Sequence, residues 1–482
     1  MKASVLCTAA IICNLWGQAQ QKHYLSLGEV IAIAQSRSPK AKQTTTEKEI
    51  STFQFQSFKS DMKPLISLYG NAPVYDKEYY GVRQPDGSIL FQSISQSNIN
   101  AGLGISQHLG FSGGDLSLNT EFTRFDDYQG HIRQYSGTPV FMKLVQPIFA
   151  VNDVKWRKKI EPLKLEEANR NFSEEMEDIA QQATVLYFNV VDVQINMSIA
   201  LANLRNMEDN YEIEKKRVLL GTTTEDKLLQ LELQVLRSNQ DLEKARYDYQ
   251  ISELSFKNYI GDDDPNDLEL SIPDKIPFLT VSLSKAIDYA RKNRAAFISF
   301  TRKTLEGQRD IAQAKADRQQ VNLSASFGLN NAANNFTNIY QNLNNQQMFS
   351  IGFNIPIVDW GRSRAKYNIA LSMAKLTRES NEFEQIKLLQ EITTLVKNMD
   401  LLQSNITLAQ KTDSVAMRRF EIANRLYQVG KLSVTDLNLA QSEKDFSRRS
   451  YISSLRDYWN GYYMLRKLTL FDFEKQQALI KD

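Results

Sequence analysis

The side chains that could most readily take part in chemistry lie in two short polar runs, each of which follows a glycine. The run after Gly430 contains Asp436, within "RLYQVGKLSVTDLNLAQ" at positions 425–441. The run after Gly221, within "KRVLLGTTTEDKLLQLE" at 216–232, offers hydroxyls and carboxylates from Thr223, Thr224, Glu225 and Asp226. A carboxylate in such a run can attract cations, or it can stabilise the start of a helix, where the helix dipole favours negative charge. From the residue alone we favour the helix-start interpretation of Asp436.

Other titratable side chains do not converge into an enzyme site. The sequence has 3 histidines, His23, His108 and His131, and none has a spacing typical of a metal site. No nucleophile motif and no cofactor cradle is present. We therefore expect no enzyme activity, no cofactor and no catalytic or metal site, and we interpret the histidines as surface or strand residues.

The bulk composition excludes one large class of partner. The chain has 482 residues, 42% of them hydrophobic and 24% charged, which is a normal folding composition. Its 58 basic and 56 acidic residues give a net charge of +2. Because this balance supplies no polycation, binding to nucleic acid is disfavoured.

The N-terminal segment reads as a secretory signal. Residues 1–19 combine Lys2, an apolar run and small residues before position 20, so we expect a signal peptide and a mature chain that begins near Gln20. The alternative is a buried N-terminal helix. Cys7 and Cys13, the chain's 2 cysteines, both lie in this segment, so the exported protein would have no disulfide. No later stretch approaches the roughly 18 apolar residues of a membrane helix, so strands would have to make any membrane crossing.

The chain is an internal duplication. "LSLGEVIAIAQSRSP" at 25–39 resembles "VSLSKAIDYARKNRA" at 281–295. Pro147 and Pro356 lie 209 residues apart, as do the two tip glycines. The two similar opening segments, which begin at 25 and 281, lie 256 residues apart. The first half therefore has 47 additional residues, all before Pro147. We predict a first repeat at 20–260, an inter-repeat linker at 261–280, and a second repeat with a C-terminal helical segment at 281–482.

Each repeat contains a pattern typical of very long helices. From Leu165 to Met207 the apolar positions follow steps of three and four, which is the heptad period of supercoiled helices. A helix between Pro162 and Leu220 would measure roughly 85 Å at 1.5 Å per residue. On heptads alone we favour an ordinary long antiparallel coiled coil, so another feature must decide.

Alternating segments indicate strands. Residues 321–330 and 349–355 place apolar side chains on one face and Asn, Ser or Gly on the other, as in membrane-crossing strands of a barrel. The first half offers similar segments at 65–70, 99–109, 115–122 and 139–149. The Asn- and Gln-rich residues 331–347 read as a solvated loop with nothing to bury. A soluble sandwich would alternate similarly, but the signal and the absence of later cysteines favour an outer membrane.

The order of these motifs resembles the TolC-like outer-membrane efflux family over essentially the whole mature sequence. The shared segments, in chain order, are "LSLGEVIAIA", "QPIF", "IPIVDWGRSRAKY", "YQVGKLSVTDL" and "RDYWNGYYMLRKLTLFDF". The resemblance implies an α+β membrane protein: a homotrimer whose strands share one outer-membrane β-barrel, continued by a long α-helical barrel in the periplasm. The function it implies is the outer-membrane exit channel of a multi-component efflux or type I secretion system. A periplasmic adaptor or a coiled-coil scaffold is the alternative.

The resemblance also assigns roles to the tips. The helix tips would form the gate and the docking surface for a periplasmic adaptor protein and an inner-membrane pump, with outer-membrane lipid around the strands. Tyr427 would be a gate-linking tyrosine and Asp436 a pore-facing carboxylate. Leu432 and Leu439 stand where the family has a basic link residue and a second pore carboxylate. The further gate candidates are in the first tip, which we expect to be one residue shorter, and are Thr224, Glu225 and Asp226.

The strand number is a separate expectation. The family pattern has four strands per subunit. The long segments 71–98 and 123–138 would permit six, because barrels combine short periplasmic turns with long outer loops. We favour four wall strands with an accessory hairpin.

Overall fold

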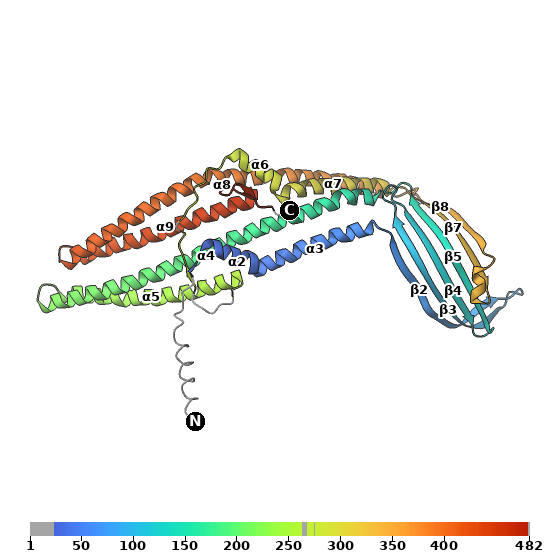
Figure 1. The fold of residues 1–482 in the computed structure, drawn as a ribbon, viewed down its shortest axis with the longest axis horizontal. Helices are drawn as coiled ribbons and strands as arrows, with labels where there is room; N and C mark the ends of the chain where they lie inside the picture. The colour runs from blue at the N-terminus through green and yellow to red at the C-terminus, as the bar shows by residue number, and fades with distance from the viewer. Residues whose placement is uncertain (1–23, 263–267, 274, 481–482) are drawn as a thin grey trace, which may run out of the picture. The chain divides into compact units, whose positions relative to one another are not determined.

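The computed structural model describes residues 24–262, 268–273 and 275–480. Figure 1 shows long helices and one large antiparallel sheet. These residues belong to two compact units: unit 1 comprises residues up to 48, 169–295 and 386–482, and unit 2 comprises 49–168 and 296–385. The predicted signal segment, with Cys7, Cys13 and the expected mature start at Gln20, lies outside the described residues, as does His23.

The helices come in matched pairs, as the duplication predicts. α2 (Leu27–Arg37) and α6 (Leu283–Asn293) have 11 residues each. α3 (Pro39–Asp61) and α7 (Ala295–Ala316) follow them. The long helices α4 (Asp153–Leu219) and α8 (Arg362–Gln428) have 67 residues each, and their hairpin partners α5 (Glu225–Ile260) and α9 (Val434–Thr469) have 36 each. The offset is the predicted 209 for both pairs, since 362 less 153 equals 434 less 225.

α4 is longer and more apolar than the sequence interpretation allowed. It begins at Asp153 and continues through Pro162, so its length is about 100 Å. It also contains a segment long and apolar enough to cross a membrane by length and composition, which makes the expectation of no such stretch wrong. The reason is a second apolar stripe: Ile179 and Val190 are buried on the heptad line, and Tyr187, Phe188 and Val191 are buried beside it. These five residues belong to the main core of unit 1, but packing there accounts for only part of the apolarity, because 22% of the membrane-length window is buried.

Unit 2 is dominated by one antiparallel sheet with the strand order β2-β3-β4-β5-β7-β8. The first half of the chain contributes four strands: β2 (Leu65–Arg83), β3 (Ile89–His108), β4 (Asp115–Asp127) and β5 (Ile132–Pro147). The second half contributes two: β7 (Gln320–Ala333) and β8 (Asn344–Asn354). Short pairs elsewhere join β1 (Tyr24–Leu25) to β6 (Glu269–Leu270), and β9 (Phe471–Asp472) to β10 (Gln477–Ala478).

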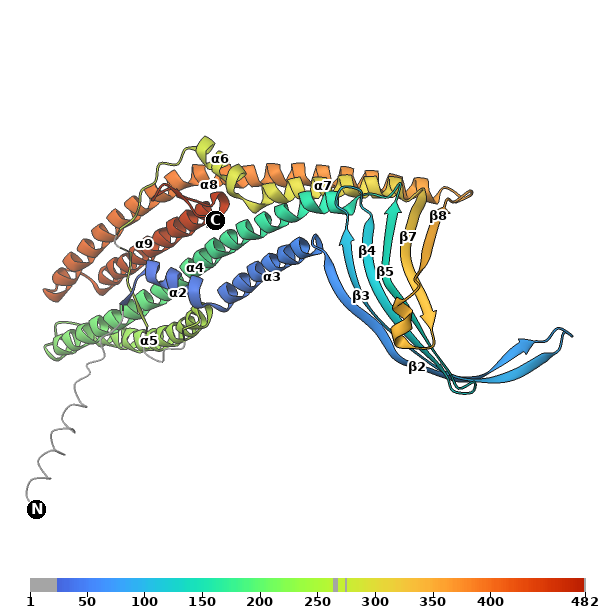
Figure 2. The ribbon, with the colours of Figure 1, turned by 45° about the vertical axis from the view of Figure 1, so that its right-hand side comes forward.

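The six-stranded sheet shows that the favoured count of four wall strands is wrong. The 47 additional residues extend the sheet, because β3 pairs with β4 from Gln96 to His108 as well as with β2. Beyond that ladder, among the described strands, the outer parts of β2 and β3 pair only with each other and form a two-stranded ribbon, which projects from the sheet in Figure 2. Most of the segment 71–98, expected as a loop, is therefore strand, as Tyr75, Tyr79 and Tyr80 favour.

The segment 331–347 also differs from its expectation of a solvated loop. It contains a 3-10 helix, η1 (Phe336–Tyr340), in which Ile339 is fully buried. Ile339 lies over Gly137 of β5, where a Cβ would come within 2.9 Å of its side chain. Phe336 packs edge-on against Phe122 at 5.1 Å between ring centroids. Hydrophobic residues scattered among the asparagines therefore anchor this segment to the sheet.

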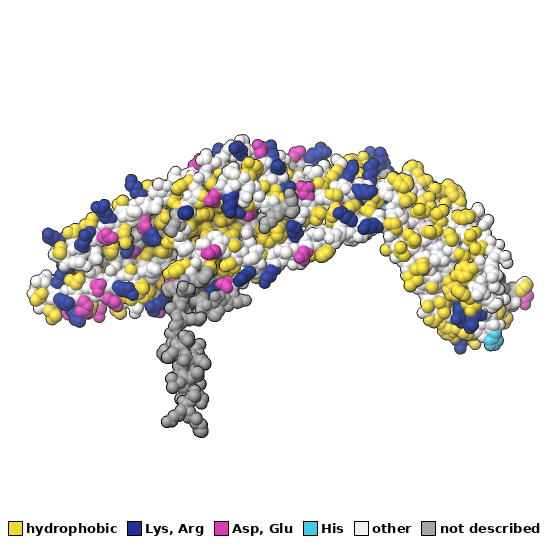
Figure 3. All heavy atoms as spheres, in the orientation of Figure 1, with side chains coloured by type: hydrophobic (Ala, Val, Ile, Leu, Met, Phe, Trp, Pro, Cys, Tyr) yellow, Lys and Arg dark blue, Asp and Glu magenta, His cyan; other side chains and the backbone are white. Residues whose placement is uncertain are grey.

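The register of the sheet separates an apolar face from a polar face. Ile66, Ile105, Leu118, Met142 and Phe327 lie directly opposite one another across five successive strands. A parallel row continues into β8, where Phe349 lies opposite Ala325. The apolar side chains on this face are largely exposed, including Ile66 at 70% and Phe349 at 67%. Figure 3 shows the hydrophobic surface that covers the strands. The predicted alternation is confirmed, and no segment among the described residues covers the apolar face.

Candidate gate and partner surface at the helical tips

Both helix hairpins of unit 1 turn through a glycine in the left-handed region. Gly221 has a φ of 68° and Gly430 a φ of 73°, where a larger side chain would be strained. The amide after each glycine donates back to the preceding helix, from Thr222 to the Arg217 carbonyl at 3.0 Å and from Lys431 to the Leu426 carbonyl at 2.8 Å. The two tips are thus the same turn built twice.

The two tips also have the same length. α4 ends at Leu219 and α5 begins at Glu225, and α8 ends at Gln428 and α9 begins at Val434. The expectation of a shorter first tip is therefore wrong. It equated Asp226 with Asp436, but these residues are the second and third residues of their helices.

Asp436 is held in the first turn of α9 by a serine. The Ser433 hydroxyl accepts a hydrogen bond from the Asp436 amide at 3.1 Å and donates to its carboxylate Oδ2 at 2.7 Å. Ser433 is the N-cap residue of this helix. The carboxylate is exposed, so it combines the helix-start role with access to solvent. Its place in a pore remains a prediction.

The candidates in the first tip lie at the corresponding helix start. Thr224 is the N-cap of α5 but makes no side-chain capping bond, and Glu225 and Asp226 are the first two helical residues. All three are exposed. Among the interactions of the described residues, none of them contacts Tyr427 or Asp436. Glu225 and Asp226 therefore place charge at the tip, but the three side chains do not form a site with Tyr427 or Asp436.

Tyr427 connects the second hairpin to the first. Its side chain is 1% exposed, and its hydroxyl donates to Glu214 Oε2 of α4 at 3.4 Å. The Arg217 guanidinium lies over the tyrosine ring at 5.3 Å and donates to the Tyr427 carbonyl at 3.1 Å. We call Glu214, Arg217, Thr223 and Tyr427 the tip link.

Glu214 is the centre of the tip link. It accepts a hydrogen bond from the Thr223 hydroxyl at 2.6 Å and an ion-pair contact from Arg217 at 3.0 Å. Burial raises the pKa of Glu214, but the hydrogen bonds from Thr223 and Arg217 outweigh it and hold the pKa below its usual value. Burial and the charge of Glu214 raise the pKa of Tyr427 to about 12. At neutral pH the carboxylate is therefore an acceptor and the phenol a donor.

Sequence reasoning predicted Tyr427 and Thr223 as tip residues but missed Glu214 and Arg217. Apart from Tyr427, the predicted candidates follow the tip glycines, whereas Glu214 and Arg217 precede Gly221. They form an ion pair at i and i+3 in the last turns of α4. Leu432, which replaces the family's basic link residue, packs against a small apolar core of Phe420, Ala423, Tyr427, Leu437 and Ala440. Arg217 supplies a cation to the link from the other hairpin.

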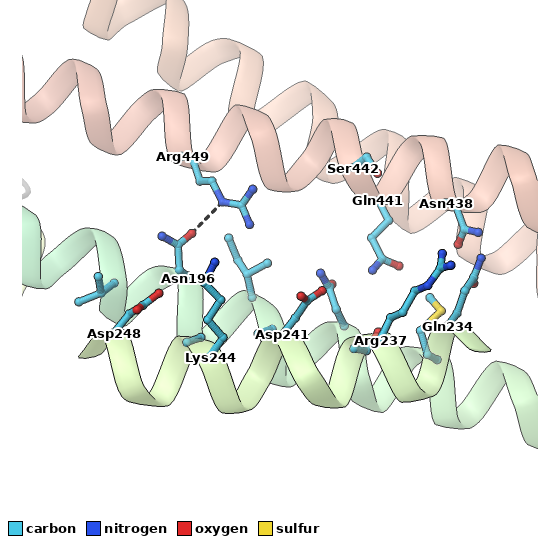
Figure 4. Close-up of a pocket in the computed structure, with 17 residues that line it drawn as sticks. Asn196, Gln234, Arg237, Asp241, Lys244, Asp248, Asn438, Gln441, Ser442 and Arg449 are labelled. Carbon is cyan, nitrogen blue, oxygen red and sulfur yellow. Dashed lines mark hydrogen bonds between the residues drawn. The ribbon is translucent and has the colours of Figure 1, made fainter. Parts of the chain in front are cut away.

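A polar groove lies between the two hairpins, along the helices that lead away from the tips. It has a volume of about 700 Å³ and is lined by residues of α4, α5 and α9. Figure 4 shows Arg237, Asp241, Lys244 and Asp248 on one side, facing α9. Arg449 of α9 donates to Asn196 of α4 at 2.7 Å across it. Among the described residues, three oxygens on its lining side chains are buried without a hydrogen-bond partner: Asn203 Oδ1, Gln234 Oε1 and Gln441 Oε1. We call this surface the hairpin groove.

Comparison with known proteins identifies this architecture. A model of the outer membrane efflux protein family matches residues 287–469, which run from α6 to the last residue of α9 and include the second tip. The second half of the chain therefore matches the outer membrane efflux protein family. Outer membrane efflux is the role that this match supports for the chain. A search of curated protein sequences found no match.

Solved structures show that more than nine-tenths of the chain has the fold of TolC-like outer membrane channels. The Campylobacter jejuni CmeC outer membrane channel superposes with a TM-score of 0.68 at 13% identity, covering 95% of this chain and 87% of CmeC. CusC gives 0.65 at 14% identity, covering 93% of each chain. The open state of the Neisseria gonorrhoeae MtrE outer membrane channel gives 0.63 at 14% identity, covering 92% and 88%. At these identities the likeness establishes the fold.

Proposed function

We propose that three copies of this outer membrane efflux protein form the exit duct of a multi-component efflux or type I secretion system. Substrates would pass from the periplasm and an inner-membrane pump, through a helical tunnel and a β-barrel, to the outside. The first repeat (20–260) and the second repeat (281–482), joined by the linker at 261–280, would contribute equivalent parts of one wall.

The observation that carries this proposal is an open sheet with an uncovered apolar face. β2 and β8 are its two outer strands, and each has a single neighbour in the chain. Unpaired backbone groups are costly in hydrocarbon, so a sheet in a bilayer has to close on itself. Six strands curve too little to enclose a duct alone, and three copies would supply three times six, or 18, strands. Pairing of β2 with β8 of the next copy would close the barrel.

The tip link supports a gating role for the tips. It ties α8 to α4 through buried polar contacts, so it favours one relative position of the two hairpins. If the gate opens by parting the hairpins, the tip link must break. In a ring of three copies, Asp436 would add a carboxylate from each copy to the periplasmic mouth, and Glu225 and Asp226 would flank it.

The hairpin groove supports docking of a periplasmic adaptor. Its shape suits a helix, because it runs between α5 and α9 along α4, and its lining carries both signs of charge with buried oxygens that lack partners. The exposed side chains Arg237, Asp241, Lys244 and Asp248 would pair with charged residues of a docked helix. The adaptor would then connect this protein to the inner-membrane pump.

A pair of neighbouring residues tests the membrane assignment. Phe349 lies on the apolar face of β8 and Ser350 on the polar face. Lysine on the lipid face of a barrel costs about 2–4 kcal/mol at mid-membrane. We expect Phe349→Lys to reduce recovery of the heat-modifiable oligomer from detergent-extracted outer membranes and Ser350→Lys to leave it near the wild-type amount. Equal recovery of both variants would contradict a lipid-facing position of Phe349.

The alternative function, a periplasmic adaptor or coiled-coil scaffold, would use the same long helices. It gives no reason for the uncovered apolar rows across the sheet. Fractionation separates the two functions, because an adaptor or scaffold of this kind would be recovered in the soluble periplasmic fraction. We expect the protein in the outer-membrane fraction, released only by detergent.

A further inference from the structure

The two strand-to-helix junctions of unit 2 share one chemical order. Each begins with exposed apolar residues and continues into exposed cations at the start of a long helix. In the second junction Ile357 is 98% exposed and Trp360 is 95% exposed. In the first, Ile148 and Phe149 are about half exposed. The exposed cations that follow are Lys155, Lys158, Arg362, Arg364 and Lys366, which we call the basic collar.

The basic collar opposes the electrostatics of its own helices. The N-terminal end of a helix carries partial positive charge and favours acids. Nevertheless α8 has no acidic residue in its first turn and places Arg362 and Arg364 there. α4 has only Asp153 in its first turn, ahead of Lys155 and Lys158. Helix stability does not account for these cations, so a partner outside the helices is the better explanation.

Within the described residues, no ion pair compensates the charge of the collar. Nearby cations are engaged: Arg157 pairs with Asp61 at 2.8 Å and Lys164 with Glu161 at 3.0 Å. For the five collar residues, no carboxylate lies within 4.0 Å in the part of the chain that the structure describes. Asp359, the acid closest in sequence to Arg362, instead accepts the amides of Gly361 and Ser363 at 3.0 Å and 2.9 Å. Figure 3 shows the Lys and Arg side chains that gather where the helices meet the strands.

The surroundings of the collar identify its occupant. Strand β5 ends at Pro147 and β8 at Asn354, just before these junctions, and in the second junction the exposed Trp360 lies in sequence between β8 and Arg362. Apolar surface, then an aromatic ring, then Lys and Arg is the order of hydrocarbon, interface and headgroup in a bilayer. Clustered cations next to a membrane surface select anionic lipids. We propose that the basic collar binds the phosphate headgroups of acidic phospholipids in the leaflet nearest the helices, an inference that rests on the proposed membrane duct.

Tryptophan fluorescence provides a direct test. Trp156 and Trp360 lie in the two junctions, Trp459 is buried in unit 1, and Trp16 falls in the predicted signal segment. The full-length assembly is placed in bilayers that contain equal mole fractions of brominated phosphatidylglycerol or brominated phosphatidylcholine. For the wild type we expect phosphatidylglycerol to be enriched at the junctions about fivefold, seen as stronger quenching that Trp360→Phe and Trp156→Phe reduce.

The charge requirement is tested with matched variants. A collar variant changes Lys155, Lys158, Arg362, Arg364 and Lys366 to Gln. A control variant removes five exposed cations of unit 1: Lys285, Lys292, Lys397, Lys411 and Arg418. We expect the collar variant to lose the lipid preference and the control to keep it. A preference retained by the collar variant would overturn the proposal.

Measurements on the wild type keep the test decisive if the collar variant fails to assemble. High salt should remove the phosphatidylglycerol preference, because it screens exposed charges. Inorganic phosphate at constant ionic strength should not remove it; if it does, the collar takes free phosphate and the lipid assignment is wrong. Equal quenching by both lipids overturns the collar and leaves the duct standing. Absence of quenching by either lipid overturns the duct and the collar together.

Discussion

The hydroxyl of Tyr427 lies 3.4 Å from Oε2 of Glu214, so residues that precede the two tip glycines are joined across the two halves of the duplication. Arg217 completes the contact by donating to the Tyr427 carbonyl and pairing with Glu214. The duplicated tips are therefore unequal partners: α4 supplies the charged pair, and α8 supplies the aromatic ring and the carbonyl. If the tips are the gate, the contacts of the tip link hold the gate closed.

Removing the charge of Glu214 should loosen the tips. Hydrogen bonds to a buried charged group contribute about 1.5–3 kcal/mol, so Glu214→Gln should raise the open population roughly tenfold or more. Tyr427→Phe removes one long hydrogen bond and should have a smaller effect in the same direction. Single-channel conductance in planar bilayers measures both. The control is Glu212→Gln, because Glu212 is exposed and pairs weakly with Lys215 at 3.9 Å. Wild-type conductance in Glu214→Gln would show that the tip link does not hold the gate.

The tip link should open in acid and be indifferent to pH near neutrality. Because the folded pKa of Glu214 is lowered, its contribution is fully present above the ordinary value of 4.5 and is lost as the pH falls through the lowered value. The raised pKa of Tyr427, about 12, keeps its phenol protonated, so that contribution is present below the ordinary value of 10.0 and is lost as the pH rises through about 12. We expect constant conductance from about pH 5 to pH 9 and an increase in stronger acid. Glu214→Gln should abolish the acid increase, and an acid response that survives in this variant would have another origin.

Local patterns predicted the elements of this protein well, because each element repeats a period that one sequence displays. The tip glycines, the 209-residue offset and the alternating strands all follow from such periods. The role of Glu214 could not be predicted in this way, since its partner Tyr427 is 213 residues away and nothing local marks the contact. The predicted number of wall strands was wrong for a related reason. Residues 71–98 have strand-forming tyrosines, but only tertiary pairing with β4 shows where the sheet ends and the ribbon begins.

The outer ribbon of β2 and β3 should be dispensable for assembly. Lys77 lies opposite Ser95, whose carbonyl accepts the Tyr128 amide at 2.9 Å, so the sheet is complete up to this pair. Replacing residues 78–94 with Asn-Gly, which favours a two-residue hairpin turn, should keep the heat-modifiable oligomer and its conductance. A matched change within the sheet, Gly102→Val, should prevent assembly, because a Cβ there would lie 2.6 Å from the Tyr69 ring and 2.9 Å from the Thr120 carbonyl. Loss of the oligomer in the ribbon deletion would show that the ribbon belongs to the wall.

Asp436 and Ser433 separate a pore role from a capping role, because each serves the same cap but only Asp436 carries charge. If three copies of Asp436 converge on the pore axis, their negative potential should attract cations, and Asp436→Ala should weaken cation selectivity and block by multivalent cations. Ser433→Ala removes the hydroxyl that bonds the Asp436 amide and carboxylate, at a cost of about 0.5–2 kcal/mol to the start of α9, and leaves the charge in place. We therefore expect an altered reversal potential in Asp436→Ala and a wild-type value in Ser433→Ala, with trimers intact in both because an exposed tip residue adds little to the packing of the long helices. A helix-start acid alone would contribute about 0.3–1 kcal/mol and no selectivity. An unchanged reversal potential in an intact Asp436→Ala trimer would therefore assign Asp436 to the helix cap and remove it from the pore.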